Sequence, residues 1–329
     1  MKKYIFIIPL ISTTQFFPAN VLHLIGTNDE KTAIVTYVSD NEQERSVKAL
    51  IKSIRELSGD YKDSKIYVVL GDVENFPSTS LKGENIQLIP LEMDKALLEY
   101  PLAFKAFAMA QVENIVKDEI QTLIWFDPGV IVLNSLDALN LHNNFDIAVR
   151  PVSLVNTIGI PPNTEPNDYW APIYKETKLD YKNIPTIKTI VDEVEIQPYY
   201  NCEVYAINPR LGICKEWVRI LTKLLKDENY QINVCTTFLK KLFLHQAVLS
   251  GVITSKVTPE RIKQLPITSG YPFNQHGQLS PEKQVASLNE VSVVIFDYAW
   301  YKIPNWMDKI QINEPLKEWL FNTYQDYLK

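Results

Sequence analysis

Hydrophobic residues follow two different spacings along this chain, and the two spacings take turns. Short uninterrupted apolar runs are typical of strands buried on both faces. Between them, apolar residues recur every three or four positions, as on one face of a helix. The first such unit has a strand at Thr32 to Val38, a helix at Asn41 to Leu57 and a strand at Lys65 to Leu70. This order predicts a right-handed βαβ unit.

The same spacings predict further elements along the rest of the chain. The predicted strands are 85–91, 122–126, 130–133, 145–149, 199–208 and 291–296, and the predicted helices are 97–116, 211–226, 237–252 and 315–328. Prolines interrupt every longer pattern between 151 and 198, which predicts a long excursion over one face rather than a linker. We therefore predict an α/β protein with a mostly parallel central sheet covered by helices.

The predicted organisation is one domain with two flanking segments. The domain comprises residues 32–310, an amino-terminal extension comprises residues 1–31, and a carboxy-terminal helix lies within residues 311–329. The extension begins with two lysines and a short apolar run, which is the layout of a secretory signal. The run contains Pro9, and Phe17 stands where a cleavage site needs a small residue. A cytoplasmic location is favoured, with export as the alternative.

Composition narrows the classes of partner. The chain has 329 residues, of which 46% are hydrophobic and 22% charged, an ordinary balance for a globular protein. Its net charge of −6 argues against nucleic acid as a partner. Cys202, Cys214 and Cys235 are too loosely spaced for a disulfide framework or a metal knuckle, and they favour a reducing compartment.

One acid stands where chemistry usually occurs in α/β proteins. The apolar run from Thr122 to Phe126 ends on Asp127, followed by Pro128 and Gly129. Ligands of open α/β sheets bind beyond the carboxyl ends of such strands, so Asp127 is a candidate site residue. The alternative is an acid that only starts a turn. The sequence contains neither a glycine-rich phosphate loop nor a Gly-x-Ser-x-Gly elbow, so hydride transfer, ATP hydrolysis and serine hydrolysis lack support.

Six segments between Thr32 and Trp306 carry a more specific pattern. They are Thr32 to Asp40, the helix containing Lys105, Trp125 to Leu133, Tyr200 to Asn208, His245 to Leu249, and Leu265 to Asn274. In this order they resemble the first strand, the following helix, the aspartate-x-aspartate strand and the later motifs of the GT-A fold glycosyltransferases. The resemblance is to the retaining glycogenin and lipopolysaccharide-galactosyltransferase family in particular.

The resemblance implies a nucleotide-diphospho-sugar transferase with a GT-A-like sandwich. Such a protein binds a nucleotide sugar, with a UDP-sugar favoured, and transfers the sugar to a glycan or protein acceptor that the sequence does not identify. The residues implied for substrate binding are Tyr37, Asp40, Lys105, Gly129, Asn201 and Gln246. The residues implied for catalysis are Asp127, Glu203 and His245.

The metal site of that family is reduced in this sequence. Two carboxylates at positions i and i+2 of an extended segment point the same way and can hold Mn²⁺ or Mg²⁺ on a diphosphate. Here Gly129 replaces the second aspartate, and Asp297 is the nearest polar residue to the place of the family's metal-binding histidine. The candidate metal ligands are therefore Asp127 and Asp297, a poor set unless substrate and water complete it. His245 and Glu203 also replace the aspartate and glycine of the family pattern.

These departures leave three hypotheses. The leading one is a glycosyltransferase-like protein that binds a nucleotide sugar with Asp127 at the diphosphate. One form of it is a metal-independent transferase in which Lys105 or His245 opposes the charge of the diphosphate. The rival is a catalytically inactive glycan- or nucleotide-binding module on the same fold, and the third is an exported carbohydrate-processing protein. Each residue also has a structural alternative: Lys105 as a solvated helix lysine, His245 as a packed histidine and Glu203 as a surface acid. If Glu203 faces the cleft, it is a candidate nucleophile or base.

Overall fold

The computed structural model describes residues 31–71, 79–156, 158–296 and 303–325. Its larger sheet contains β1 (Thr32–Val38), β2 (Lys65–Leu70), β3 (Ile86–Pro90), β4 (Thr122–Phe126), β6 (Ile147–Val149), β9 (Val204–Ile207) and β10 (Ile262–Gln264). A smaller sheet contains β5 (Val130–Val132), β11 (Ser269–Pro272) and β12 (Val293–Ile295), and β7 (Ile187–Lys188) pairs with β8 (Glu195–Ile196).

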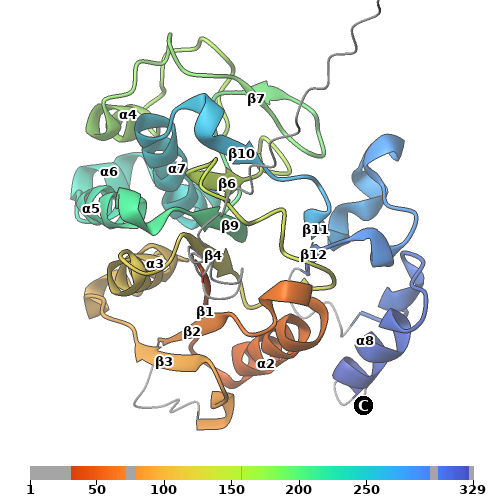
Figure 1. Ribbon diagram of the computed structural model, residues 1–329. Helices are drawn as coiled ribbons and strands as arrows, with labels where there is room; N and C mark the ends of the chain where they lie inside the picture. Colours follow the sequence, from red (N-terminus) through yellow and green to blue (C-terminus); the bar gives the residue numbers. More distant parts are fainter. Residues whose placement is uncertain (1–30, 72–78, 157, 297–302, 326–329) are drawn as a thin grey trace, which may run out of the picture.

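The larger sheet is mixed but mostly parallel. Its strand order is β10-β6-β9-β4-β1-β2-β3, and β9 is antiparallel to both of its neighbours, while every other adjacent pair is parallel. The smaller sheet has the order β11-β12-β5, and its strands β11 and β12 lie beside the larger sheet (Figure 1). Its strand β5 follows β4 along the chain, after the turn at Asp127. The predicted α/β class with a mostly parallel sheet is confirmed.

Helices cover both faces of the larger sheet, and α8 packs beside the smaller sheet. They are α2 (Asn41–Leu57), α3 (Phe104–Val116), α4 (Ala171–Thr177), α5 (Ile213–Leu225), α6 (Glu228–Asn233), α7 (Phe238–Lys256) and α8 (Leu316–Tyr324). Ala33, Val35 and Tyr37 of β1 belong to the core formed with α3, α5 and α7. Ile34 and Val38 belong to the core formed with α2 on the opposite face. This alternation explains why β1 reads as a continuous apolar run.

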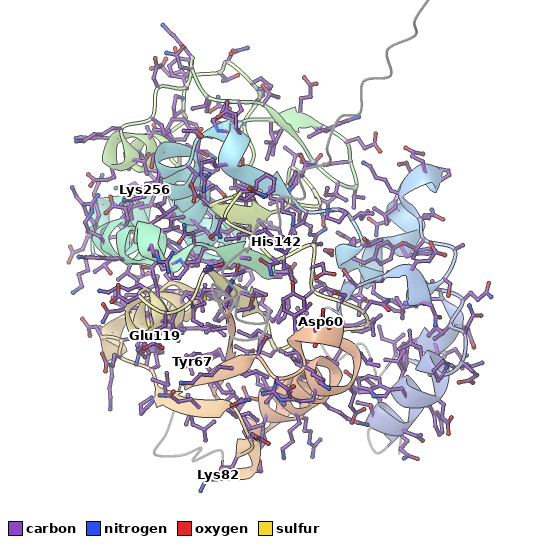
Figure 2. The ribbon with its side chains drawn as sticks, viewed as in Figure 1. Asp60, Tyr67, Lys82, Glu119, His142 and Lys256 are labelled. Atoms are coloured by element: carbon purple, nitrogen blue, oxygen red, sulfur yellow. The ribbon has the colours of Figure 1, made fainter. Side chains whose placement is uncertain are left out.

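Charged side chains are exposed on the outer surface, and α8 closes one end of the molecule. Lys82, Glu119 and Lys256, all marked in Figure 2, are exposed. The helix α8 packs through Leu316, Leu320 and Tyr324 into a third core that includes β11 and β12. None of the helices in the described ranges combines the length and the apolar composition needed to cross a membrane.

Several predicted boundaries need correction. The helix predicted to begin at residue 97 begins at Phe104, because Leu102 has a positive φ of 59° that no α-helix accommodates. The strand predicted at 199–208 is shortened to Val204–Ile207, and Tyr200 instead forms a single bridge with Pro151. The short helix α6, capped by Asp227, was not predicted. Residues 326–328 of the predicted last helix, like residues 1–30 of the extension, lie outside the described residues.

Candidate active site

A cavity of about 620 Å³ opens beyond the carboxyl ends of β1 and β4. Eight of the predicted site residues line this one cavity, namely Asp40, Lys105, Asp127, Gly129, Asn201, Glu203, His245 and Gln246. They come from the starts of α2 and α3, the β4–β5 turn, the segment before β9, and α7. The predicted metal ligand Asp297 lies outside the described residues.

Asp127 is the point at which the larger and smaller sheets meet. The strand β4 before it is buried along its whole length, and its continuation is fixed by backbone hydrogen bonds. The amide of Asp127 donates to the carbonyl of Glu203 at 3.0 Å, and the amide of Val130 donates to the carbonyl of Asp127 at 3.0 Å. The turn through Pro128 and Gly129 therefore presents the carboxylate of Asp127 at the cavity wall.

Both carboxylate oxygens of Asp127 already have side-chain donors. Lys105 Nζ donates to Oδ2 at 2.6 Å, and Trp125 Nε1 donates to Oδ1. The side chain of Lys105 is 3% exposed and that of Asp127 is 20% exposed. The alternative of a solvated helix lysine is therefore wrong, because Lys105 is a buried cation paired with the candidate site acid.

The electrostatic environment keeps this pair charged at neutral pH. Burial alone would lower the pKa of Lys105, but the carboxylate of Asp127 raises that pKa above its ordinary value. Burial raises the pKa of Asp127 to about 6, with Glu203 adding to the rise and Lys105 opposing it. Asp127 is thus ionised above about pH 6, and the cavity holds a fixed ammonium group.

A second carboxylate stands next to this pair. Asn201 Nδ2 donates to Glu203 Oε2 at 2.8 Å, and the amide of Glu203 donates to Asn201 Oδ1 at 2.9 Å. Asn201 is buried, while Glu203 is only half-buried and lines the cavity. The geometry therefore places Glu203 on the cavity side, the condition under which its carboxylate is a candidate nucleophile or base.

His245 is held in a neutral form by its surroundings. Its Nδ1 lies 2.8 Å from the carbonyl of Leu242, which can only accept, so Nδ1 carries the proton and Nε2 is an acceptor. The thiol of Cys202 lies 3.0 Å from this Nε2 and 3.3 Å from Gln246 Oε1. Burial and the nearby Lys105 lower the pKa of His245 well below its ordinary value. The structure therefore supports the packed histidine and leaves Lys105 as the cation.

The neutral state extends to the neighbouring thiol. Burial raises the pKa of Cys202 to about 12, so this group is a protonated thiol and not a thiolate nucleophile. Its contacts with His245 and Gln246 fix the start of the buried part of α7 against the segment before β9. The Cys202–His245 contact is a packing arrangement rather than a catalytic dyad.

The described residues do not fit a Mn²⁺ or Mg²⁺ site. A Cβ atom at Gly129, where the family pattern has its second aspartate, would lie 2.5 Å from the carbonyl oxygen of Phe296. The amide of Phe296 donates to the carbonyl of Gly129 at 3.1 Å, so the two backbones are joined at this point. Across the described ranges, no group of three or more His, Cys, Asp or Glu side chains is arranged to hold a metal ion. Asp127 is the single carboxylate of the motif that remains there, and Lys105 already binds it.

An aromatic pair forms the wall near the end of β1. The rings of Tyr37 and Phe104 are stacked with centroids 3.8 Å apart and planes 19° from parallel. Tyr37 is 5% exposed and does not line the cavity, whereas Phe104 does. Tyr37, predicted to bind substrate, thus lies one layer behind the cavity surface. Phe104 was missed because the helix was predicted to begin at residue 97, so this ring was not recognised as standing at the helix start.

Polar groups of α2 lie at the same end of the cavity. Asp40 caps the helix, and its Oδ1 accepts from the amides of Glu42 and Gln43. Gln43 Oε1 accepts from the amide of Ser39 at 2.9 Å and from the hydroxyl of Ser39 at 3.1 Å. These contacts fix the side-chain amide of Gln43 so that its Nε2 donor is the group left to interact with a ligand.

The fold and the site together define a GT-A-like glycosyltransferase. A family model described as the Rhodobacterales glycosyltransferase domain matches residues 35–256, which is more than half of the chain, and the protein belongs to this family. The comparison with curated proteins found no match.

Three solved structures are similar to this chain. An active-site mutant of LgtC matches with 14% identity over 90% of this chain and 95% of its own, with a TM-score of 0.52. The bifunctional glycosyltransferase WbbM matches with 14% identity over 90% of this chain and 52% of its own, with a TM-score of 0.50. A complex of the galactosyltransferase LgtC with donor and acceptor sugar analogs matches with 12% identity over 89% and 95% and a TM-score of 0.47. At 14% identity, the first two matches show the fold alone.

Proposed function

We propose that this glycosyltransferase takes a sugar from a nucleoside-diphospho-sugar, passes it to a glycan or protein acceptor, and needs no divalent metal. The buried Lys105–Asp127 pair carries the proposal. In a metal-dependent transferase, a divalent ion held by carboxylates neutralises the diphosphate. Here the ammonium group of Lys105 is paired with Asp127, the carboxylate that would hold the ion. The charge of Lys105 therefore takes over the electrostatic role of the metal ion.

The charges around the cavity single out Lys105 for this role. Its charged lining residues in the described ranges are Lys105 and the four acids Asp40, Glu42, Asp127 and Glu203. As the bond between the sugar and the phosphate oxygen breaks, negative charge develops on the nucleoside diphosphate. A fixed cation in a site shielded from water stabilises that charge without reorganisation. Glu203 is proposed either to attack the sugar or to take the proton of the acceptor hydroxyl.

Calorimetric titration with UDP-sugars in the presence of EDTA or Mn²⁺ tests the proposal. We expect equal binding and equal release of UDP in both buffers. Asp127→Asn should weaken binding or turnover at least tenfold, about 1.4 kcal/mol. No binding to any nucleotide sugar would remove the proposal. Strict dependence on Mn²⁺ would remove its metal-independent part and return Asp297 to the set of ligands.

We further infer that the base of the donor is uracil. Phe104 offers an aromatic surface at the cavity wall, made rigid by the stacked Tyr37 behind it. Gln43 offers a fixed amide donor, which suits a base carbonyl and not an exocyclic amino group. Uracil has carbonyl groups on both sides of its ring nitrogen, whereas cytosine has an amino group on one side.

Phe104→Ala is expected to weaken UDP binding about tenfold, because stacking of a base on an aromatic side chain contributes about 1–3 kcal/mol. The affinity for inorganic pyrophosphate should not change, since pyrophosphate has no base. Gln43→Glu, which replaces the donor by an acceptor, should reduce the preference for UDP over CDP. Calorimetry with UDP, CDP and pyrophosphate measures all three, and an equal loss of UDP and pyrophosphate affinity in Phe104→Ala would contradict the assignment.

The rival function is a nucleotide- or glycan-binding module without turnover. The observation in its favour is Gly129, where the backbone of Phe296 fills the place of the second acid. Release of free UDP from a UDP-sugar by the wild-type protein, absent in Asp127→Asn, would exclude this rival. Tight binding of UDP-sugar without release in the presence of any tested acceptor would support it.

A further inference from the structure

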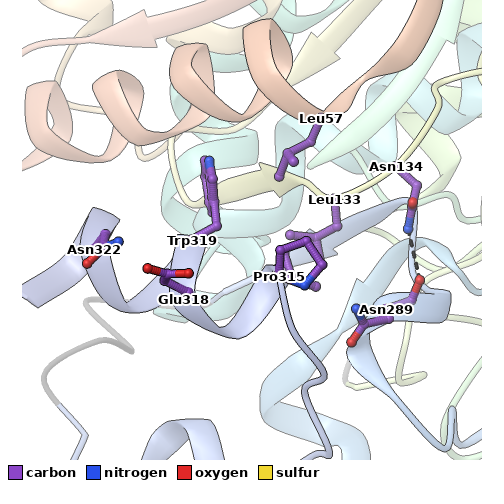
Figure 3. Close-up of a pocket in the computed structure, with 9 residues that line it drawn as sticks. Leu57, Leu133, Asn134, Asn289, Pro315, Glu318, Trp319 and Asn322 are labelled. Atoms are coloured by element: carbon purple, nitrogen blue, oxygen red, sulfur yellow. Dashed lines mark hydrogen bonds between the residues drawn. The ribbon is translucent and has the colours of Figure 1, made fainter.

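A second cavity, of about 440 Å³, lies at the other end of α2 (Figure 3). It is lined by the end of α2, the end of β5, the turn at Asn289 and the first turns of α8. It shares no lining residue with the cavity of about 620 Å³ at Asp127, which is called the donor cavity from here on. The 17 residues of α2 span about 25 Å, and they separate Asp40 at one cavity from Leu57 at the other.

Trp319 forms a fixed aromatic wall of this cavity. Its Nε1 donates to the carboxylate of Glu56, and Lys52 Nζ lies 5.0 Å from the ring centroid. Lys52 also donates to the hydroxyl of Thr323 at 3.1 Å, which ties α2 to α8. Figure 3 shows the indole standing upright beside the cavity, with Leu57, Leu133 and Pro315 across from it. An aromatic surface held in this way loses little conformational freedom when a ligand binds.

Polar groups surround this aromatic wall. The amide nitrogen of Asn134 donates to the carbonyls of Asn289 at 3.0 Å and Val291 at 2.8 Å, so its side-chain oxygen is presented as an acceptor. Glu318 and Asn322 are exposed on the same side of α8, one turn apart, and line the cavity. A carboxylate and two side-chain amides supply both donors and acceptors for hydroxyl groups.

The chemistry of the lining selects one class of ligand. Glu318 is the only charged residue among the described lining residues and it is an acid, so phosphates and other anions are disfavoured. The lining is mostly apolar, but a purely apolar chain would leave the polar groups of Asn134, Glu318 and Asn322 without partners. A pyranose ring suits both the aromatic wall and the polar side chains. Its C–H face packs on an indole, and its hydroxyls form hydrogen bonds with amides and carboxylates. The volume lies within the usual range of small-ligand pockets.

We propose that this cavity is a second carbohydrate-binding site, which holds a neutral glycan through stacking on Trp319. The site is independent of the donor cavity and of the transfer reaction. Through this site the protein binds a sugar chain at a distance from the place where the sugar is transferred.

Binding of the full-length protein to an array of neutral oligosaccharides tests the proposal. Calorimetry with the oligosaccharide that binds most strongly then measures the affinity. We expect Trp319→Ala to weaken that binding at least tenfold and Trp319→Phe to retain part of it. Because Trp319 also joins α8 to α2, the surface variant Glu318→Ala/Asn322→Ala provides a second test that should not disturb folding, and it should weaken binding at least fivefold.

Two controls separate this site from other surfaces. Phe321→Ala removes an aromatic side chain of the same helix that is 49% exposed and does not line the cavity, and it should bind like the wild type. Lys105→Met alters the donor cavity and should also leave glycan binding unchanged. The proposal is overturned if no neutral glycan binds, if only anionic glycans bind, or if Glu318→Ala/Asn322→Ala and folded Trp319→Ala bind as the wild type does. If the donor proposal is wrong but this one is right, the wild-type protein binds neutral glycans and does not bind UDP-sugars.

Discussion

Lys105→Met is expected to lower the rate of sugar transfer by at least 100-fold, because it removes the cation that opposes the leaving diphosphate. Removal of one preorganised group that stabilises transition-state charge typically costs about 10²–10³ in rate. The same change leaves Asp127 in the cavity wall beside Glu203 without its partner. Breaking a buried ion pair from one side costs about 3–5 kcal/mol of stability. Single-turnover kinetics and urea unfolding measure the two effects separately.

A double-mutant cycle distinguishes a catalytic role from a structural one. Lys105→Met/Asp127→Asn replaces the ion pair by two neutral side chains of similar size, so it should recover most of the stability that Lys105→Met loses. If Lys105 acts on the diphosphate, the double variant stays much slower than Asp127→Asn alone although it is well folded. If Lys105 only supports the fold, the double variant regains the activity of Asp127→Asn together with its stability, and the proposed role is wrong. Added Mn²⁺ in the double variant should not restore the rate.

The sequence predicted the place of the site better than its chemistry. The apolar run of β4 and the turn after it identify where Asp127 lies, because backbone periodicity depends on local residues. The pairing of Asp127 with Lys105 depends on two elements 22 residues apart, and no local pattern reports whether a lysine on a helix turns inward. The neutral state of His245 likewise follows from the carbonyl of Leu242 and the thiol of Cys202, which only the fold brings together.

Aromatic residues show the same division. The resemblance predicts that Tyr37, near the end of β1, binds substrate. The structure places Tyr37 near the end of this strand, as the sequence predicts. Which ring faces the cavity is decided by the start of α3, and this start was predicted seven residues too early. The true start at Phe104 places that ring over Tyr37 and into the cavity wall. An error in one helix boundary therefore hid the residue proposed to stack on the base.

Gly129→Asp is expected to abolish transfer instead of creating a metal-dependent enzyme, although it restores the aspartate-x-aspartate pattern. A Cβ at this position would lie 2.5 Å from the carbonyl of Phe296, far inside contact distance, and the obstacle is backbone that cannot rotate away. The end of β12 must therefore move from the β4–β5 turn, at a cost of about 1–3 kcal/mol. The new carboxylate also stands close to Asp127 and Glu203, so it adds repulsion in a cavity with one cation.

Gly129→Ala separates the two causes. It introduces the same Cβ without the charge, so thermal unfolding should show a similar loss of stability in both variants, and only Gly129→Asp should lose UDP-sugar affinity beyond that. Calorimetry with Mn²⁺ should show no ion binding to either variant in the absence of nucleotide. If Gly129→Asp instead folds normally and transfers sugar only with Mn²⁺, the glycine is a simple loss of a ligand, and Lys105 has not replaced the metal ion. We expect Gly129→Asp to lose transfer because the backbone of Phe296 already fills the space that a second acid would need.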